Sequence, residues 1–173
     1  MDSFLRSPRL LGLVVGGHGT GKSTLLRSWD STLNARLGPG QWFCFQSDAT
    51  ARQKTERIRD FGRVAKDASW LVIDGMEQLR PTQRWKVRRI ASQSGVKCIA
   101  TSHKNLVGWP VIFRTRIEPA LILELTNELI ENQPDDVVGS IRRRLRSIDL
   151  QNVVNLREFW FELYDVAATS AVP

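Results

Sequence analysis

Cysteine, histidine and long apolar runs are scarce in this sequence, and each scarcity argues against a class of function. The 173 residues include two cysteines, Cys44 and Cys98, and two histidines, His18 and His103. Their spacing matches neither a zinc site nor a disulfide framework. Both cysteines fall in apolar segments, so we expect small buried thiols in a reducing, cytoplasmic setting.

No run of about 18 apolar residues occurs, so we expect no transmembrane helix and no membrane association. Residues 1–6 lack the apolar region of a secretory signal. The length fits one α/β domain with a small addition, and the hydrophobic fraction of 42% is ordinary. The net charge of +7 permits contact with nucleic acid or another anionic partner.

The most informative segment runs from Gly16 to Ser23 and reads GGHGTGKS. It fits the phosphate-binding pattern G-x-x-x-x-G-K-[ST]. The apolar run Leu10–Val15 precedes it, and a helical pattern extending to Leu37 follows it. Because a strand, a glycine-rich loop and a helix follow one another, the sequence predicts binding of a nucleoside triphosphate.

Each residue type in this loop has a physical role toward phosphate. The glycines let successive backbone N–H groups face one anion at a helix N-terminus. Lys22 would reach the β- and γ-phosphates, and Ser23 would place its hydroxyl on Mg²⁺. Thr24 either contacts the α-phosphate or simply starts the helix. The predicted nucleotide-binding residues of the loop are Gly16, Gly17, His18, Gly19, Thr20, Gly21, Lys22, Ser23 and Thr24.

Apolar runs alternate with helical patterns up to residue 118. Expected strands are Leu10–Val15, Trp42–Phe45, Trp70–Ile73, Val96–Thr101 and Val111–Phe113. Expected helices are Gly21–Leu37, which stops at Gly38-Pro39-Gly40, then Ala51–Lys66, and one from Pro81 that ends before Gly95. This predicts an α/β three-layer sandwich with a mainly parallel sheet of about five strands. The site should form where the strands end.

Only helical patterns follow Pro119. We therefore expect a nucleotide-binding core over residues 1–118 and a C-terminal helical segment over residues 119–173. The first helix has an apolar stripe of Ile122, Leu125 and Leu129. Asp135 is expected to cap a second helix, and Asn155 with Glu158 resembles a capping box for the last. The apolar positions expected on these two helices are Val138, Ile141 and Leu145, then Leu156, Phe159, Trp160, Leu163 and Val166.

Asp74 ends an apolar strand, where a carboxylate is costly unless a cation or hydrogen bond satisfies it. Mg²⁺ held by Ser23 would do so, and the segment resembles the Walker B motif of P-loop NTPases. The alternative is a turn or helix-capping Asp before Gly75. Hydrolysis also needs a group that orients water, and Glu77 is the nearest candidate. Glu77 is alternatively a first-turn helix residue, and Asp48 is a weaker candidate for the same role.

The segments together resemble the P-loop NTPase superfamily and, within it, AAA+-like ATPases, over Leu10 to Phe113. In many of these ATPases the catalytic acid directly follows the Walker B Asp, where this chain has Gly75. If the fourth strand lies beside the first, Ser102, with Thr101 second, resembles the sensor 1 position. Near it, His103 would bond water or phosphate, or cap a helix.

Two further elements of the resemblance concern arginine. Asn155–Glu158 resembles a sensor 2 segment, which implies that Arg157 reaches the γ-phosphate; the alternative is a solvated helix. Arg114 and Arg116 are either arginine fingers toward a second copy or surface residues. The resemblance further implies ATP and Mg²⁺ as ligands, a reduced helical lid and self-association.

Other P-loop branches fit less well. No N-K-x-D motif for guanine is present, which favours ATP over GTP, and the transporter signature L-S-G-G-Q is missing. The sequence therefore favours an ATPase that couples nucleotide binding or hydrolysis to a macromolecular partner, with Lys22, Glu77 and Ser102 as the catalytic candidates.

Two alternatives stay open at this point. A small-molecule or nucleotide kinase could use Arg142–Arg144 and Arg146 as a basic lid. A nucleotide-regulated nucleic-acid-binding module could use the run Arg84–Arg89, in which Trp85 stands among basic residues, and the run Arg142–Arg146. On a helix, this run also has the pattern of any amphipathic helix with a basic exterior. Either a protein or a nucleic acid could contact such basic helices.

Overall fold

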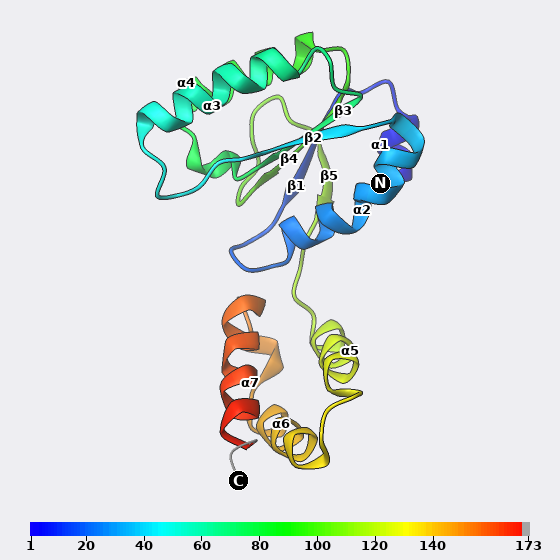
Figure 1. Ribbon diagram of the computed structural model, residues 1–173, viewed down its shortest axis with the longest axis vertical. Helices are drawn as coiled ribbons and strands as arrows, with labels where there is room; N and C mark the ends of the chain where they lie inside the picture. Colours follow the sequence, from blue (N-terminus) through cyan, green and yellow to red (C-terminus); the bar gives the residue numbers. More distant parts are fainter. Residues whose placement is uncertain (171–173) are drawn as a thin grey trace. The chain divides into compact units, whose positions relative to one another are not determined.

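Five parallel strands form one sheet in the order β2-β3-β4-β1-β5 (Figure 1). The structure is a computed structural model that describes residues 1–170. The strands are β1 (Leu11–Val15), β2 (Gly40–Cys44), β3 (Trp70–Asp74), β4 (Lys97–Ser102) and β5 (Val111–Arg114). The predicted α/β fold is confirmed, and β4 lies between β1 and β3.

Helices cover both faces of this sheet, so the fold has three layers (Figure 1). One face packs against α1 (Asp2–Arg6) and α2 (Lys22–Leu37). The other packs against α3 (Ala51–Val64) and α4 (Pro81–Gln93). Successive strand residues supply the two cores, since Leu13 and Val15 belong to the α3/α4 side and Val14 to the α2 side. Strands buried on both faces are why these apolar runs are continuous.

Two local expectations were wrong, and each has a physical reason. Gly40 is the first residue of β2, although the sequence predicted it as the last residue of the segment that ends the preceding helix. A Cβ at Gly40 would lie 2.0 Å from Cε2 of Trp70, so only glycine fits beside that ring. Cys44 ends β2 with an exposed side chain, whereas Cys98 is buried as expected. β2 is the outermost strand on its side of the sheet, so its last residue lacks the cover that β4 has.

The chain divides into two compact units. The first comprises residues 1–16 and 22–115, and the second comprises residues 17–21 together with the chain from residue 116 onward. The second unit contains α5 (Pro119–Ile130), α6 (Asp135–Ser147) and α7 (Leu156–Ser170). Residues 1–170 also contain two short 3-10 helices, η1 (Met76–Gln78) in the first unit and η2 (Leu150–Asn152) in the second. Among residues 1–170, no helix combines the length and apolar character needed to cross a membrane.

The helical unit has its own core, which differs in detail from the expected stripes. Ile122, Thr126 and Ile130 face this core on α5, while Leu129 is 49% exposed. The hydroxyl of Thr126 donates to Ile122 O at 2.7 Å, so this buried polar group is satisfied. Asp135 is the first helical residue and Pro134 holds the N-cap, so the predicted Asp135 cap was wrong.

Candidate functional site

The glycine-rich loop joins β1 to α2 and brings a buried lysine to the sheet edge. Two of its glycines, Gly19 and Gly21, have positive φ angles of 70° and 82°. Lys22 is the first residue of α2 and is 8% exposed, and its Nζ donates to Gly16 O at 2.8 Å. Burial lowers the pKa of Lys22, while the negative charges of Glu77 and Asp74 act to raise it. The loop therefore has an ammonium group held at its own backbone.

Three polar side chains from α2, β3 and β4 meet at Asp74. Ser23 Oγ donates to Asp74 Oδ2 at 2.7 Å, and Thr101 Oγ1 donates to Asp74 Oδ1 at 2.6 Å. Thr101 Oγ1 also accepts from Gly75 N at 2.9 Å. A hydroxyl beside a carboxylate is a donor set that suits Mg²⁺, which is commonly held by one or two protein ligands plus phosphate oxygens. Among residues 1–170, no three His, Cys, Asp or Glu side chains form a fuller metal cage.

Glu77 lies in η1, directly after β3, with an unusual environment for a carboxylate. His103 Nε2 lies 3.2 Å from Glu77 Oε1, and the Glu77 side chain is 20% exposed. The other oxygen, Oε2, is buried and has no hydrogen-bond partner in the described part of the chain. Such an oxygen is costly unless it accepts a hydrogen bond from water or a ligand. Glu77 is thus a residue of the first turn of η1, as the alternative interpretation had it, and its side chain is also mostly buried.

α4 holds the backbone around Glu77 in place. Arg84 Nε donates to Met76 O at 3.0 Å, and its NH2 group donates to Glu77 O at 2.8 Å. Met76 is itself fully buried. These contacts fix η1 against α4, so the position of Glu77 depends on the packing of that helix.

Gly75 occupies the position where the resemblance leads one to look for an acid. Its φ angle is 87°, and a Cβ would lie 2.4 Å from the backbone oxygen of Phe45. An L-residue is strained at such an angle and would also clash with fixed backbone. The chain at this point excludes a side chain, so the nearest acid comes from Glu77.

The structure separates the two sensor 1 candidates. The Thr101 side chain reaches Asp74, as described above. Ser102 is buried, its Oγ accepts from Lys104 N at 3.3 Å, and its carbonyl accepts from Gly16 N at 3.2 Å. Ser102 therefore contacts the start of the loop through its backbone. Sequence reasoning missed the link from Thr101 to Asp74, although the pairing of Ile73 with Ala100 puts the two side by side.

Within the helical unit, residues 17–21 lie against the start of α7. Leu156 N donates to Gly19 O at 3.1 Å, and a Cβ on Gly19 would lie 1.7 Å from Asn155 Oδ1. Asn155 Oδ1 also accepts from Arg157 N at 3.1 Å, so Asn155 caps α7 through Arg157, whereas the sequence predicted a capping box with Glu158. Arg157 is exposed in the first turn of α7. Asn155, interpreted from the sequence only as a cap and part of a sensor segment, is thus a direct neighbour of the loop.

The remaining candidates are described by their own local contacts and exposure. Arg114 donates to Asn105 Oδ1 at 3.1 Å, and Arg116 is exposed. Asp48 is exposed in the segment between β2 and α3, and Thr24 is exposed in the first turn of α2. In the predicted basic lid, Arg144 pairs with Glu162. Two loop side chains remain. His18 is exposed, and the hydroxyl of Thr20 donates to Gly17 O at 3.0 Å.

Comparison with known proteins identifies the fold. No protein-family model and no curated protein matches the chain. The AMPPCP-bound DnaA of Aquifex aeolicus has a similar structure, with a TM-score of 0.64 and 14% identity over 95% of this chain. The ADP complex of the FIGL-1 AAA domain is also similar, with a TM-score of 0.50 and 14% identity over 99% of this chain. The chain spans 57% of that DnaA chain and 77% of that FIGL-1 chain. The chain has the P-loop NTPase fold of the AAA+ type.

Proposed function

We propose that this chain binds Mg·ATP and hydrolyses it slowly, and that the nucleotide state controls a contact with a macromolecular partner. The observation that carries the proposal is the 2.7 Å contact between Ser23 and Asp74. It joins the helix that follows the phosphate-binding loop to the carboxyl end of β3. Lys22 supports it, because a buried ammonium at this loop suits a polyphosphate. The similar solved structures carry AMPPCP and ADP.

In this proposal, the loop amides and Lys22 bind the phosphates, and Ser23 with Asp74 holds Mg²⁺. The metal supplies charge neutralisation across the β- and γ-phosphates when bound. Glu77 orients and deprotonates the attacking water through its buried Oε2, and His103 fixes the other oxygen. Thr101 positions Asp74, while Ser102, Thr24 and Arg157 remain candidates for contact with the phosphates.

Three broader features belong to the same proposal. Residues 1–118 act as the nucleotide-binding core, and residues 119–173 act as a reduced lid. The missing guanine motif favours ATP over GTP, and two free cysteines suit a cytoplasmic protein. A water-orienting Glu77 favours hydrolysis over transfer to an acceptor, which makes an ATPase the better proposal than a kinase.

The test combines binding and turnover. Wild-type protein should bind ATP more tightly with Mg²⁺ than with a chelator and should release free phosphate, while Lys22→Ala should lose binding. Glu77→Gln should keep binding but lower turnover by about 100-fold or more, the usual contribution of a general base. Glu56→Gln is the matched control, since Glu56 is 51% exposed on α3 and pairs with Arg52 there.

Three outcomes would contradict the proposal. If magnesium does not change the affinity of the wild-type protein for ATP, the proposed metal site is wrong. Equal turnover in Glu77→Gln and Glu56→Gln would remove Glu77 as the water-orienting group. Phosphorylated acceptor that forms faster than free phosphate would instead identify a kinase.

A further inference from the structure

The outer surface of α4 is strongly basic, and its helix contains no acidic residue. Four basic residues lie within Pro81–Gln93, and Arg80 directly precedes it. The basic residues of the helix are Arg84, Lys86, Arg88 and Arg89. Some of these cations make contacts within the fold, and the others have exposed side chains that a partner could contact.

Two of them are committed. Arg84 donates to the carbonyls of Met76 and Glu77, as described above. Arg88 packs against Gly108, where a Cβ would lie 2.4 Å from the Arg88 guanidinium carbon. The other three, Arg80, Lys86 and Arg89, have exposed side chains. Among residues 1–170, no acidic side chain forms an ion pair with these three.

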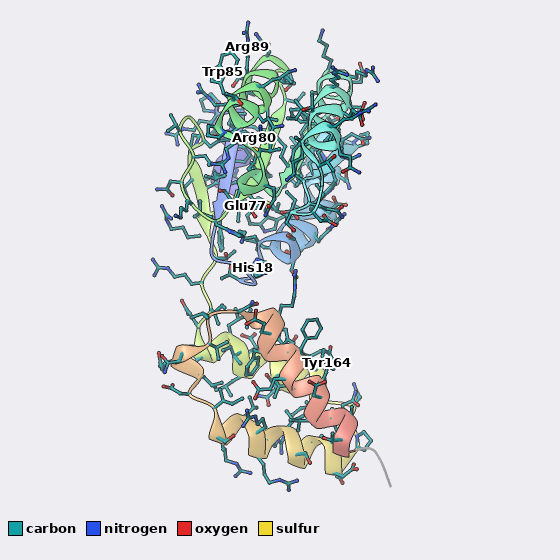
Figure 2. All side chains as sticks on the ribbon, turned by 90° about the vertical axis from the view of Figure 1, so that its left-hand side faces the viewer. His18, Glu77, Arg80, Trp85, Arg89 and Tyr164 are labelled. Carbon is teal, nitrogen blue, oxygen red and sulfur yellow. The ribbon has the colours of Figure 1, made fainter. Side chains whose placement is uncertain are left out.

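An exposed tryptophan lies on α4 one residue before Lys86 and four residues before Arg89. Trp85 is 58% exposed, whereas Trp70 is 1% and Trp109 is 4% exposed. The guanidinium carbon of Arg89 lies over the Trp85 ring, 5.5 Å from its centroid. Figure 2 shows Trp85 and Arg89 beside each other on α4, with Arg80 at the start of the helix. A planar aromatic ring and a planar cation are thus held together on the surface.

The neighbouring helix extends the positive charge. α3 packs beside α4, with the position of a Cβ on Gly62 lying 3.5 Å from Ile90 Cδ1. Its two acids, Glu56 and Asp60, already pair with Arg52 and Arg63 on the same helix. The remaining basic residues of α3 are Lys54, Arg57 and Arg59. The two helices therefore leave an excess of positive charge on one side of the sheet.

We propose that Trp85, Arg80, Lys86 and Arg89 form a binding surface for single-stranded nucleic acid. The three cations contact successive phosphates, and the indole stacks on an unpaired base. The exposed indole favours nucleic acid over an acidic peptide, since carboxylates need cations but no stacking face. It favours a single strand over a duplex, because the base faces of a duplex are already stacked. This proposal does not use the nucleotide site, so it can be tested independently of the proposed function.

The test measures binding of a fluorescent oligothymidylate of about 20 nucleotides, long enough for a single-strand site. Full-length protein without ATP is titrated at several salt concentrations, and the anisotropy of the oligonucleotide is followed. Trp85→Ala should weaken binding by about tenfold, with little change in salt dependence. Arg89→Gln should weaken binding and reduce the slope of log K against log salt by about 0.7.

One matched control comes from each unit. Tyr164→Ala removes an aromatic ring that is 60% exposed, and Arg6→Gln removes one exposed positive charge from the end of α1. Both should leave the affinity within about twofold of wild type, the range of a surface substitution away from the site. Trp85→Phe keeps a smaller stacking ring, so its affinity for the oligonucleotide should lie between those of wild type and Trp85→Ala. This variant keeps the proposal testable if Trp85→Ala fails to fold.

Several results would overturn the proposal. Equal losses in Trp85→Ala and Tyr164→Ala would show that the indole makes no specific contact. Polyglutamate that binds as tightly as the oligonucleotide would identify an acidic protein surface instead. A blunt duplex that binds more tightly than the single strand would remove the stacking argument. Lys22→Ala should bind the oligonucleotide normally, so a failed ATP site and a failed nucleic-acid surface give different results.

Discussion

Thr101 holds the oxygen of Asp74 that Ser23 leaves unused. Its hydroxyl donates to Oδ1 at 2.6 Å, whereas Ser23 donates to Oδ2 at 2.7 Å. Both carboxylate oxygens are therefore directed by side chains from neighbouring elements of the fold. Asp74 is oriented before any ligand arrives, which limits the reorganisation that a bound cation would require.

Thr101→Val should destabilise the protein and weaken the metal site together. The substitution leaves Asp74 Oδ1 and the N–H of Gly75 without their buried partner. The free energy of unfolding should fall by about 1–3 kcal/mol, which urea denaturation measures. Thr101→Ser keeps the hydroxyl and should retain most of the Mg²⁺-dependent ATP affinity. Equal magnesium dependence in the valine variant and wild type would show that Thr101 does not position Asp74.

Ser23→Ala should remove the effect of magnesium on ATP affinity. In the proposed site, Mg²⁺ would lose one of its two protein contacts, so the gain in affinity from magnesium should fall by about tenfold or more. Affinity in the presence of a chelator should change little. Ser28→Ala is the matched control on the same helix, because the exposed Ser28 hydroxyl donates to the carbonyl of Leu25 at 2.8 Å. A similar loss in both variants would argue against a metal contact at Ser23.

The sheet could be predicted from sequence because the signals are local. Continuous apolar runs such as Trp70–Ile73 and the breaker around Pro39 mark the alternating elements, and the structure confirms them. The boundaries that moved did so for tertiary reasons. Gly40 joined a strand because the Trp70 ring requires a residue without a side chain there, which no local pattern encodes.

The site was less predictable, because its geometry depends on pairs far apart in the chain. Asp74 and Ser23 could be expected from motifs, but the contact of Asp74 with Thr101 follows from strand order and register. The inward position of Glu77 depends on Arg84, a residue of α4 that looks like an ordinary surface cation in sequence. The close approach of Asn155 to Gly19 likewise brings together residues from opposite ends of the chain.

Moving the acid from position 77 to position 75 should not restore hydrolysis. Gly75 has a φ angle of 87°, and its Cβ position lies 2.4 Å from Phe45 O. Gly75→Glu combined with Glu77→Gln should therefore stay inactive and lose about 2 kcal/mol or more of stability. Release of phosphate by the double variant at the wild-type rate would show that the backbone can adapt.

Gly75→Ala and Gly95→Ala should separate clash from strain. Both glycines have positive φ angles, 87° and 76°, but a Cβ on Gly95 meets nothing within 4 Å. In both variants the positive φ angle destabilises the folded state by about 1–2 kcal/mol, and only Gly75→Ala adds a steric clash with the backbone. Thermal or urea unfolding of the pair should therefore show the larger loss at Gly75.

Asp74→Asn should make the thiol of Cys44 more reactive. Although the Cys44 side chain is exposed, partial desolvation raises its pKa, and the negative charge of Asp74, its partner in the register of β2 and β3, raises that pKa further. Removing that charge lowers the pKa, so more thiolate is present at pH 8 and alkylation becomes faster. In both proteins the rate should rise with pH until the thiol is ionised. Asp48→Asn removes an equal charge from an exposed loop and should leave the rate unchanged. Cys98 is buried and should react only after unfolding, so two fast thiols in the native protein would contradict this arrangement.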